Sequence, residues 1–223
     1  MVDPLVPTVT SIDRTTSGAG PAFSTPVCHL LIIGLDGATF DVLNPLMAEG
    51  RMPRLSEAIA AGASGRLRST VPPITPAAWT TFLTGKNPGA HGIIDFERYD
   101  VHTNKLSFNS TRCLDHVRNL WQILGDHGLK VGSVNVPMTY PPTPVNGFLV
   151  SGFETPGPES DLVYPPALKN AILQRWPDPT LRAKWRRRTF GSDAVFRENL
   201  NYIARSFHQG ADMTQWLGEH HGW

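Results

Sequence analysis

The spacing of apolar residues after residue 28 alternates between strand-like and helix-like segments. Residues 29–35 (HLLIIGL) are almost continuously apolar, as expected of a strand buried on both faces. Residues 40–61 then carry apolar residues at helical spacing, with an interruption around residues 50–53. This pattern predicts a buried strand followed by a broken helix.

A second strand and helix are expected over residues 64–85. Residues 64–70 alternate between polar and apolar positions like a short edge strand. Residues 76–83 predict a helix with Thr75 as its N-cap, Pro76 at its first position and Gly85 at its end.

The rest of the chain repeats this alternation. An amphipathic helix is predicted over residues 114–124, and strands over 130–136 and 148–153; further helices are expected over 166–176 and 195–216. Alternating elements of this kind indicate an α/β fold, with a mainly parallel sheet covered by helices on both faces. Ligands of such sheets bind beyond the carboxyl ends of the strands, which is where Asp36 follows the first strand.

Composition narrows the class of protein. Residues 1–26 lack a long apolar stretch and are rich in Pro, Ser, Thr and Gly, so we expect a disordered leader rather than a signal peptide, followed by one domain over 27–223. No run of about eighteen apolar residues predicts a transmembrane helix, and we expect a cytoplasmic protein. Cys28 and Cys113 lack ligand or disulfide spacing and are expected to be free thiols.

A formal net charge of +1 does not predict nucleic acid or an anionic membrane as a partner. The basic residues between 182 and 188 are a local exception, and we interpret them as a solvated charged face. The oligomeric state does not follow from the sequence.

The candidate chemistry lies at Asp36 and Thr75. A threonine hydroxyl is a weak nucleophile and needs a base or a metal before it can attack phosphorus. A divalent cation held by Asp36 and Thr75 would activate it, and the free N–H groups of a helix start favour an anionic substrate such as phosphate. The alternative is that Thr75 is an ordinary helix cap.

Several segments together resemble one known family. They are IGLDGATFD (33–41), PPITPAAWTTFLTG (72–85), NPGAHGIIDF (87–96), VNVPMTYPP (134–142) and VSGF (150–153). This combination resembles the type I phosphodiesterase / nucleotide pyrophosphatase branch of the alkaline phosphatase superfamily, across roughly residues 29–223.

The resemblance implies hydrolysis of small phosphate esters with two divalent metal ions, zinc or in some members manganese. Asp36 would be a metal ligand, and Thr75 both a metal ligand and the catalytic nucleophile that forms a phosphothreonine intermediate. His91 matches a turn in which the family's histidine is more often structural than a ligand. Phe96 replaces an asparagine that helps nucleotide pyrophosphatases hold a phosphoryl oxygen, which weakens the case for a nucleotide substrate.

The family's other metal ligands come from its C-terminal half, so the resemblance implies that this chain is an N-terminal fragment with an incomplete ligand set. We therefore expect this chain alone to be inactive, and residues 160–223 to form a cap or an insertion. Asp126 and His127 mimic the family's Asp-His pair, but they end a predicted helix and are interpreted as non-ligands. The alternatives are a phosphomutase or another hydrolase of the superfamily, or a non-catalytic fragment that binds an anion or a partner.

Overall fold

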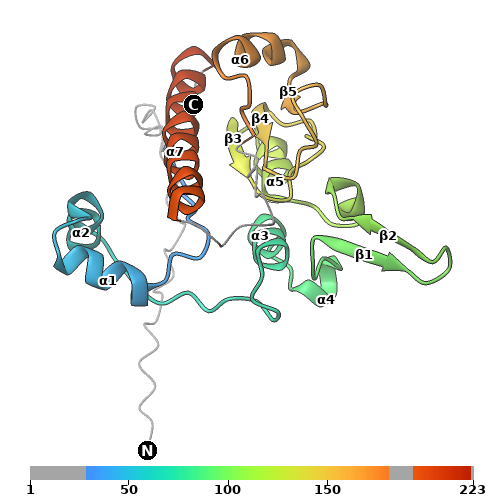
Figure 1. Cartoon of the computed structure of the whole chain (residues 1–223). Helices are drawn as coiled ribbons and strands as arrows, with labels where there is room; N and C mark the ends of the chain where they lie inside the picture. The colour runs from blue at the N-terminus through green and yellow to red at the C-terminus, as the bar shows by residue number, and fades with distance from the viewer. Residues whose placement is uncertain (1–28, 181–192, 222–223) are drawn as a thin grey trace, which may run out of the picture. The chain divides into compact units, whose positions relative to one another are not determined.

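The computed structural model describes residues 29–180 and 193–221 (Figure 1). The helices and strands described here belong to one unit, Ile33–Trp223. The predicted leader, Cys28 and the basic residues 182–188 lie outside the described residues.

The main sheet has three strands in the order β3-β4-β5. Strand β3 (Val131–Val136) runs parallel to β4 (Gly147–Ser151), and β4 is antiparallel to β5 (Val163–Tyr164). The strands predicted over 130–136 and 148–153 are thus confirmed. The sheet is mixed and small, so the predicted parallel pairing is confirmed for β3 and β4 alone.

Helices cover both faces of this sheet, as predicted. On β4, Phe148 and Val150 belong to a core with Ile172 of α6 (Lys169–Arg175) and with residues of α7 (Asp193–His221). Between them, Leu149 points to a second core that contains Trp121 of α5 (Leu120–Asp126). Successive side chains of a strand point to opposite faces, so β4 is shared by both cores.

The first helical region is broken where the sequence predicts it. Helix α1 (Phe40–Ala48) ends before Gly50, whose φ of +70° is the left-handed conformation that glycine adopts readily. Helix α2 (Pro53–Ala61) begins with a proline, which suits the first turn because that turn needs no N–H donor there.

Helix α3 (Thr75–Thr84) confirms the helix predicted over 76–83. It ends at Gly85, which has a φ of +64° and donates its N–H to the carbonyl of Thr81. The short α4 (Pro88–His91) follows, capped by the Asn87 side chain, which accepts a hydrogen bond from Ala90 N–H.

Two predicted strands are wrong. Residues 29–35 form no strand, and Leu30 and Ile33 are 81% and 75% exposed. Residues 64–70 are also without strand structure. No strand in the described part of the chain pairs with either segment, and without a neighbour an apolar run cannot be buried on both faces.

The helix predicted over 114–124 starts later than expected. Leu114 ends the 3-10 helix η1 (Thr111–Leu114), and α5 begins after Asn119. Asn119 accepts from Gln122 N–H while the Gln122 side chain accepts from Asn119 N–H, a capping box that sets the helix start.

The two C-terminal helices are confirmed. Residues 166–176 contain the 3-10 helix η2 (Pro166–Leu168) and α6, and α7 includes the predicted 195–216. Helix α7 contacts β3 (Figure 1). Its side chains Met213 and Leu217 are fully buried.

The sequence pattern missed a hairpin. Strand β1 (Glu97–Asp100) pairs antiparallel with β2 (Lys105–Phe108) as a separate two-stranded sheet (Figure 1). Every residue of both strands is exposed.

Candidate active site

Thr75 is the first residue of α3 and not its cap. Ile74 holds the cap position in an extended conformation, and no side chain caps this helix end. The first intrahelical bond at this end is donated by Ala78 to Ile74, so the N–H of the half-buried Thr75 precedes the helical ladder. This donor and the helix dipole favour an anion in front of Thr75.

Asp36 lies in a turn that follows the exposed apolar segment. Gly37 has a φ of +68°, and its carbonyl accepts a hydrogen bond from Thr39 N–H at 3.0 Å. The reversal at Gly37 lets the chain turn directly into α1 after presenting the Asp36 carboxylate.

The two predicted site residues lie together. The Thr75 hydroxyl donates a hydrogen bond to Asp36 Oδ2 at 2.9 Å. Asp36 is exposed and Thr75 is half-buried, so the pair is open to a substrate from solvent. With the Thr75 hydroxyl free of a capping role, the alternative that it is an ordinary N-cap is wrong.

A close contact places the segment before Asp36 against α3. A Cβ atom on Gly34 would lie 2.2 Å from Trp79 Cη2, so only glycine allows this approach without a shift. Trp79 is held in turn by an edge-to-face contact with Phe82 at 5.9 Å between ring centroids. The contact two residues before Asp36 therefore helps to hold its turn beside Thr75.

His91 contacts α3 through a hydrogen bond to Thr81. It is fully buried, its Nδ1 accepts from Ile93 N–H at 3.1 Å, and its Nε2 lies 3.0 Å from Thr81 Oγ1. Because Nδ1 is an acceptor, Nε2 carries the proton and donates to Thr81. Burial lowers the pKa of His91 and keeps the ring neutral. Both nitrogens are used within the protein, as expected of a structural histidine.

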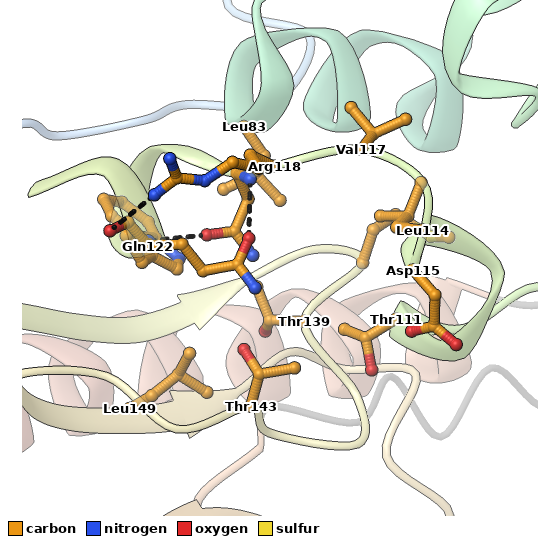
Figure 2. A pocket seen from close by; sticks show the side chains of 13 residues that line it. Leu83, Thr111, Leu114, Asp115, Val117, Arg118, Gln122, Thr139, Thr143 and Leu149 are labelled. Carbon is orange, nitrogen blue, oxygen red and sulfur yellow. Dashed lines mark hydrogen bonds between the residues drawn. The ribbon is translucent and has the colours of Figure 1, made fainter. Parts of the chain in front are cut away.

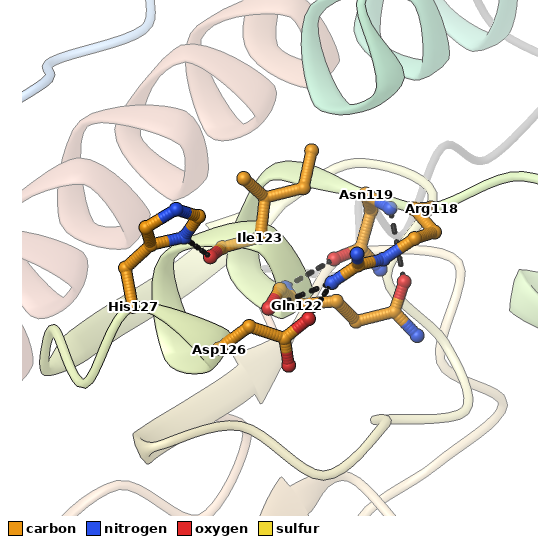
Figure 3. A network of polar contacts seen from close by, with 6 residues as sticks. All are labelled: Arg118, Asn119, Gln122, Ile123, Asp126 and His127. Atoms are coloured by element: carbon orange, nitrogen blue, oxygen red, sulfur yellow. Dashed lines mark hydrogen bonds and ion pairs between the residues drawn. The ribbon is translucent and has the colours of Figure 1, made fainter.

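The Asp126 and His127 pair also has a structural role (Figure 3). Asp126 forms an ion pair with Arg118, and His127 Nδ1 lies 2.8 Å from the Ile123 carbonyl at the end of α5. A protonated Nδ1 donates this bond to an otherwise free helix carbonyl. The interpretation of these residues as non-ligands fits this geometry.

Phe96 also packs within the protein. Its ring makes an edge-to-face contact with Phe153, with 5.9 Å between the centroids. An aromatic side chain engaged in this way offers no hydrogen bond to a phosphoryl oxygen.

A cavity of about 180 Å³ lies elsewhere, between α5 and the segment after β3 (Figure 2). Its lining includes Leu83 from the far end of α3, Arg118 and Thr139, but neither Asp36 nor Thr75. The candidate site is therefore on the open surface at the start of α3, separate from this cavity.

Glu154 is a half-buried carboxylate that no sequence motif predicts. Glu154 Oε1 accepts from the N–H groups of Thr139 and Tyr140 at 2.7 and 3.0 Å, whereas Oε2 is buried without a partner. Burial raises the pKa of Glu154, against the effect of the N–H donors. This side chain joins the segments that follow β3 and β4.

The oxygen atoms of Asp36 and Thr75 have the chemistry of metal ligands. Asp36 and Thr75 offer two oxygen atoms, which suit zinc or manganese, but a catalytic zinc usually has three protein ligands. Within residues 29–180 and 193–221, no group of three or more His, Cys, Asp or Glu side chains is placed to hold a metal. The pair therefore fits a metal as two ligands of an incomplete set.

Comparison with known families identifies the class. The chain matches the family model for type I phosphodiesterase / nucleotide pyrophosphatase over residues 30–218, and it belongs to this family of the alkaline phosphatase superfamily. No curated protein and no solved structure is significantly similar to it. The family supports hydrolysis of phosphate esters and is generally metal-dependent.

None of the described helices is long and apolar enough to cross a membrane.

Proposed function

We propose that this chain carries the nucleophile of a metal-dependent hydrolase of small phosphate esters, with Thr75 as the attacking residue and Asp36 as its partner. The observation that carries the proposal is the 2.9 Å hydrogen bond from the Thr75 hydroxyl to Asp36 Oδ2. The family match over residues 30–218 supports the reaction class.

Two kinds of group in this chain have separate roles at the start of α3. Asp36 orients the Thr75 hydroxyl and faces its proton, and the N–H of Thr75 attracts the negatively charged phosphoryl oxygens. A divalent metal on Asp36 and Thr75, zinc or manganese, would supply the Lewis acidity that a carboxylate alone lacks.

In the proposed reaction, Thr75 Oγ1 forms a bond to phosphorus while the ester bond to the leaving group breaks. The leaving oxygen takes the electron pair, and the hydroxyl proton passes to a base, for which Asp36 is in hydrogen-bond reach. Water then attacks the phosphothreonine, which releases phosphate or a phosphomonoester and restores Thr75.

The test uses the full chain with added zinc or manganese, and any turnover of the wild type, however weak, overturns the expectation that this chain alone is inactive. Bis-p-nitrophenyl phosphate and p-nitrophenyl phosphate report diesterase and monoesterase activity, and mass spectrometry of acid-quenched samples detects a phosphoryl group on Thr75. We expect Thr75→Ala to remove both signals, Thr75→Ser to retain part of them, and Thr103→Ala in the hairpin turn to change neither.

The covalent signal distinguishes this proposal from the alternative of a non-catalytic anion-binding chain. Turnover or labelling that persists in Thr75→Ala contradicts the role of Thr75. A folded wild-type chain that shows neither turnover nor label with either metal agrees with the expectation that this chain alone is inactive, and it contradicts a catalytic role for the chain by itself.

A further inference from the structure

The hairpin leaves one edge of β1 open. Asn109 donates its N–H to the Phe96 carbonyl at 2.7 Å, so the alternation of an antiparallel ladder directs the backbone groups of Arg98 and Asp100 toward β2. The N–H and C=O groups of Glu97 and Tyr99 then point away from β2. No other strand in the described part of the chain pairs with that edge.

The hairpin also has two different faces. Glu97, Tyr99, Leu106 and Phe108 lie on one face, and the last three of these side chains are 58%, 63% and 75% exposed. The other face carries Arg98, Asp100, Lys105 and Ser107. A two-stranded ribbon with an uncovered apolar face is only marginally stable in water, and further strands stabilise it.

The charges of β1 are complementary to those of a second β1. If two copies pair antiparallel about Tyr99, Arg98 lies directly opposite the partner's Asp100, and this contact occurs twice by symmetry. The outward N–H and C=O groups of Tyr99 then bond to the partner's Tyr99. A register centred on Arg98 would instead place two arginines opposite each other, so the charges select the first register.

Asp100 is held in place for this contact. Its Oδ1 accepts from the N–H groups of His102 and Thr103 at 2.9 and 3.2 Å, which fixes the carboxylate at the end of the strand. We propose that β1 is a dimerisation edge, where a second copy of this chain adds its own β1 as an antiparallel strand centred on Tyr99. The result is a four-stranded sheet with the apolar residues of both copies on one face.

Sedimentation equilibrium of the full chain tests this over a range of protein concentrations. We expect a wild-type dimer, and we expect Arg98→Asp or Asp100→Arg to raise its Kd roughly tenfold or more, because each creates two like-charge contacts. An equimolar mixture of the two variants should dimerise again, because each substituted position then faces an opposite charge. Arg54→Asp on α2 makes the same change in net charge as Arg98→Asp and should leave the Kd unchanged.

Hydrogen exchange gives a second readout, because Asp100→Arg also removes the turn bonds. In the dimer the Tyr99 amide should be protected from exchange, and Arg98→Asp should abolish this protection. The amide of residue 98, which faces β2 within the same chain, serves as an internal reference. The proposal fails if the folded wild-type chain stays monomeric at every concentration, or if its dimer is insensitive to Arg98→Asp. It also fails if two folded variants remain monomeric when mixed.

Discussion

The Thr75 hydroxyl donates a hydrogen bond to the Asp36 carboxylate, although the two residues are 39 positions apart in the sequence. A helix start and a glycine-containing turn bring them together at a solvent-accessible surface. Their geometry suits a nucleophile and its orienting partner.

The charge of Asp36 should matter as well as its hydrogen bond. We expect Asp36→Asn, which keeps an acceptor for Thr75, to lower phosphate ester hydrolysis by at least roughly a hundredfold, since an amide is a poor base and metal ligand. Asp41→Asn in the first turn of α1 is the matched control and should have little effect. Rates with bis-p-nitrophenyl phosphate check this, and an Asn variant with wild-type rate contradicts the role of Asp36.

Gly34 should control the alignment of the site without contributing a chemical group. Gly34→Ala places a Cβ atom in the Trp79 ring, and we expect a roughly tenfold to hundredfold loss of activity as the Asp36 turn shifts. Adding Trp79→Phe makes room and should restore part of the loss. The yield of labelled Thr75 is the measurement, and an unaffected Gly34→Ala variant contradicts this positioning role.

His91 should make the protein less stable in acid. Because burial lowers the pKa of His91 below its ordinary 6.5, the unfolded chain binds more protons just below that pH. The contribution of His91 is fully present above pH 6.5 and is lost as pH falls toward the lower pKa of the folded state. Urea unfolding across this window should show the slope, and His91→Gln, which cannot titrate, should reduce it.

Glu154 should have the opposite effect. Since burial raises the pKa of Glu154 above its ordinary 4.5, the folded protein binds more protons above that pH than the unfolded chain does. The contribution of Glu154 is full below pH 4.5 and is lost as pH rises through the raised pKa. Glu154→Gln keeps the acceptor for Thr139 and Tyr140, and its free energy of unfolding should decline less with pH than that of the wild type.

The capping box of α5 offers a test of local stability. Asn119→Ala removes the acceptor for Gln122 N–H and should lower the free energy of unfolding by about 1 kcal/mol. Asn119→Asp retains an acceptor at the same position and should cost little. Urea denaturation of the wild type and the two variants measures these free energies of unfolding. Equal stability of all three proteins contradicts a role for this cap.

The parts of the fold predicted from sequence are those with local signals. The break between α1 and α2 follows from Gly50 and Pro53, and β3 and β4 follow from compact apolar runs next to a helix. The pairing of Asp36 with Thr75 was also predicted, from the chemistry of the two residues and the family resemblance. Its geometry depends on a turn and a helix start, and not on the strand expected before Asp36.

The parts of the fold that were not predicted depend on tertiary contacts, which the periodicity of apolar residues in the sequence does not reveal. Residues 29–35 have the composition of a buried strand, yet a strand needs at least one neighbour to pair with, and the described part of the chain supplies none for this segment. The hairpin was missed because its few alternating apolar residues are all exposed and its turn has no glycine. Thr75 was expected to be a cap because threonine is a common cap, but its hydroxyl bonds Asp36.

The position of Leu149 between Phe148 and Val150 has a consequence for how the domain melts. Because neighbouring residues of β4 anchor the two cores on opposite sides of the sheet, neither core can loosen without disturbing the strand that holds the other. The layers around β4 should therefore be lost in one cooperative transition, and their amides should share a single opening free energy in native-state hydrogen exchange.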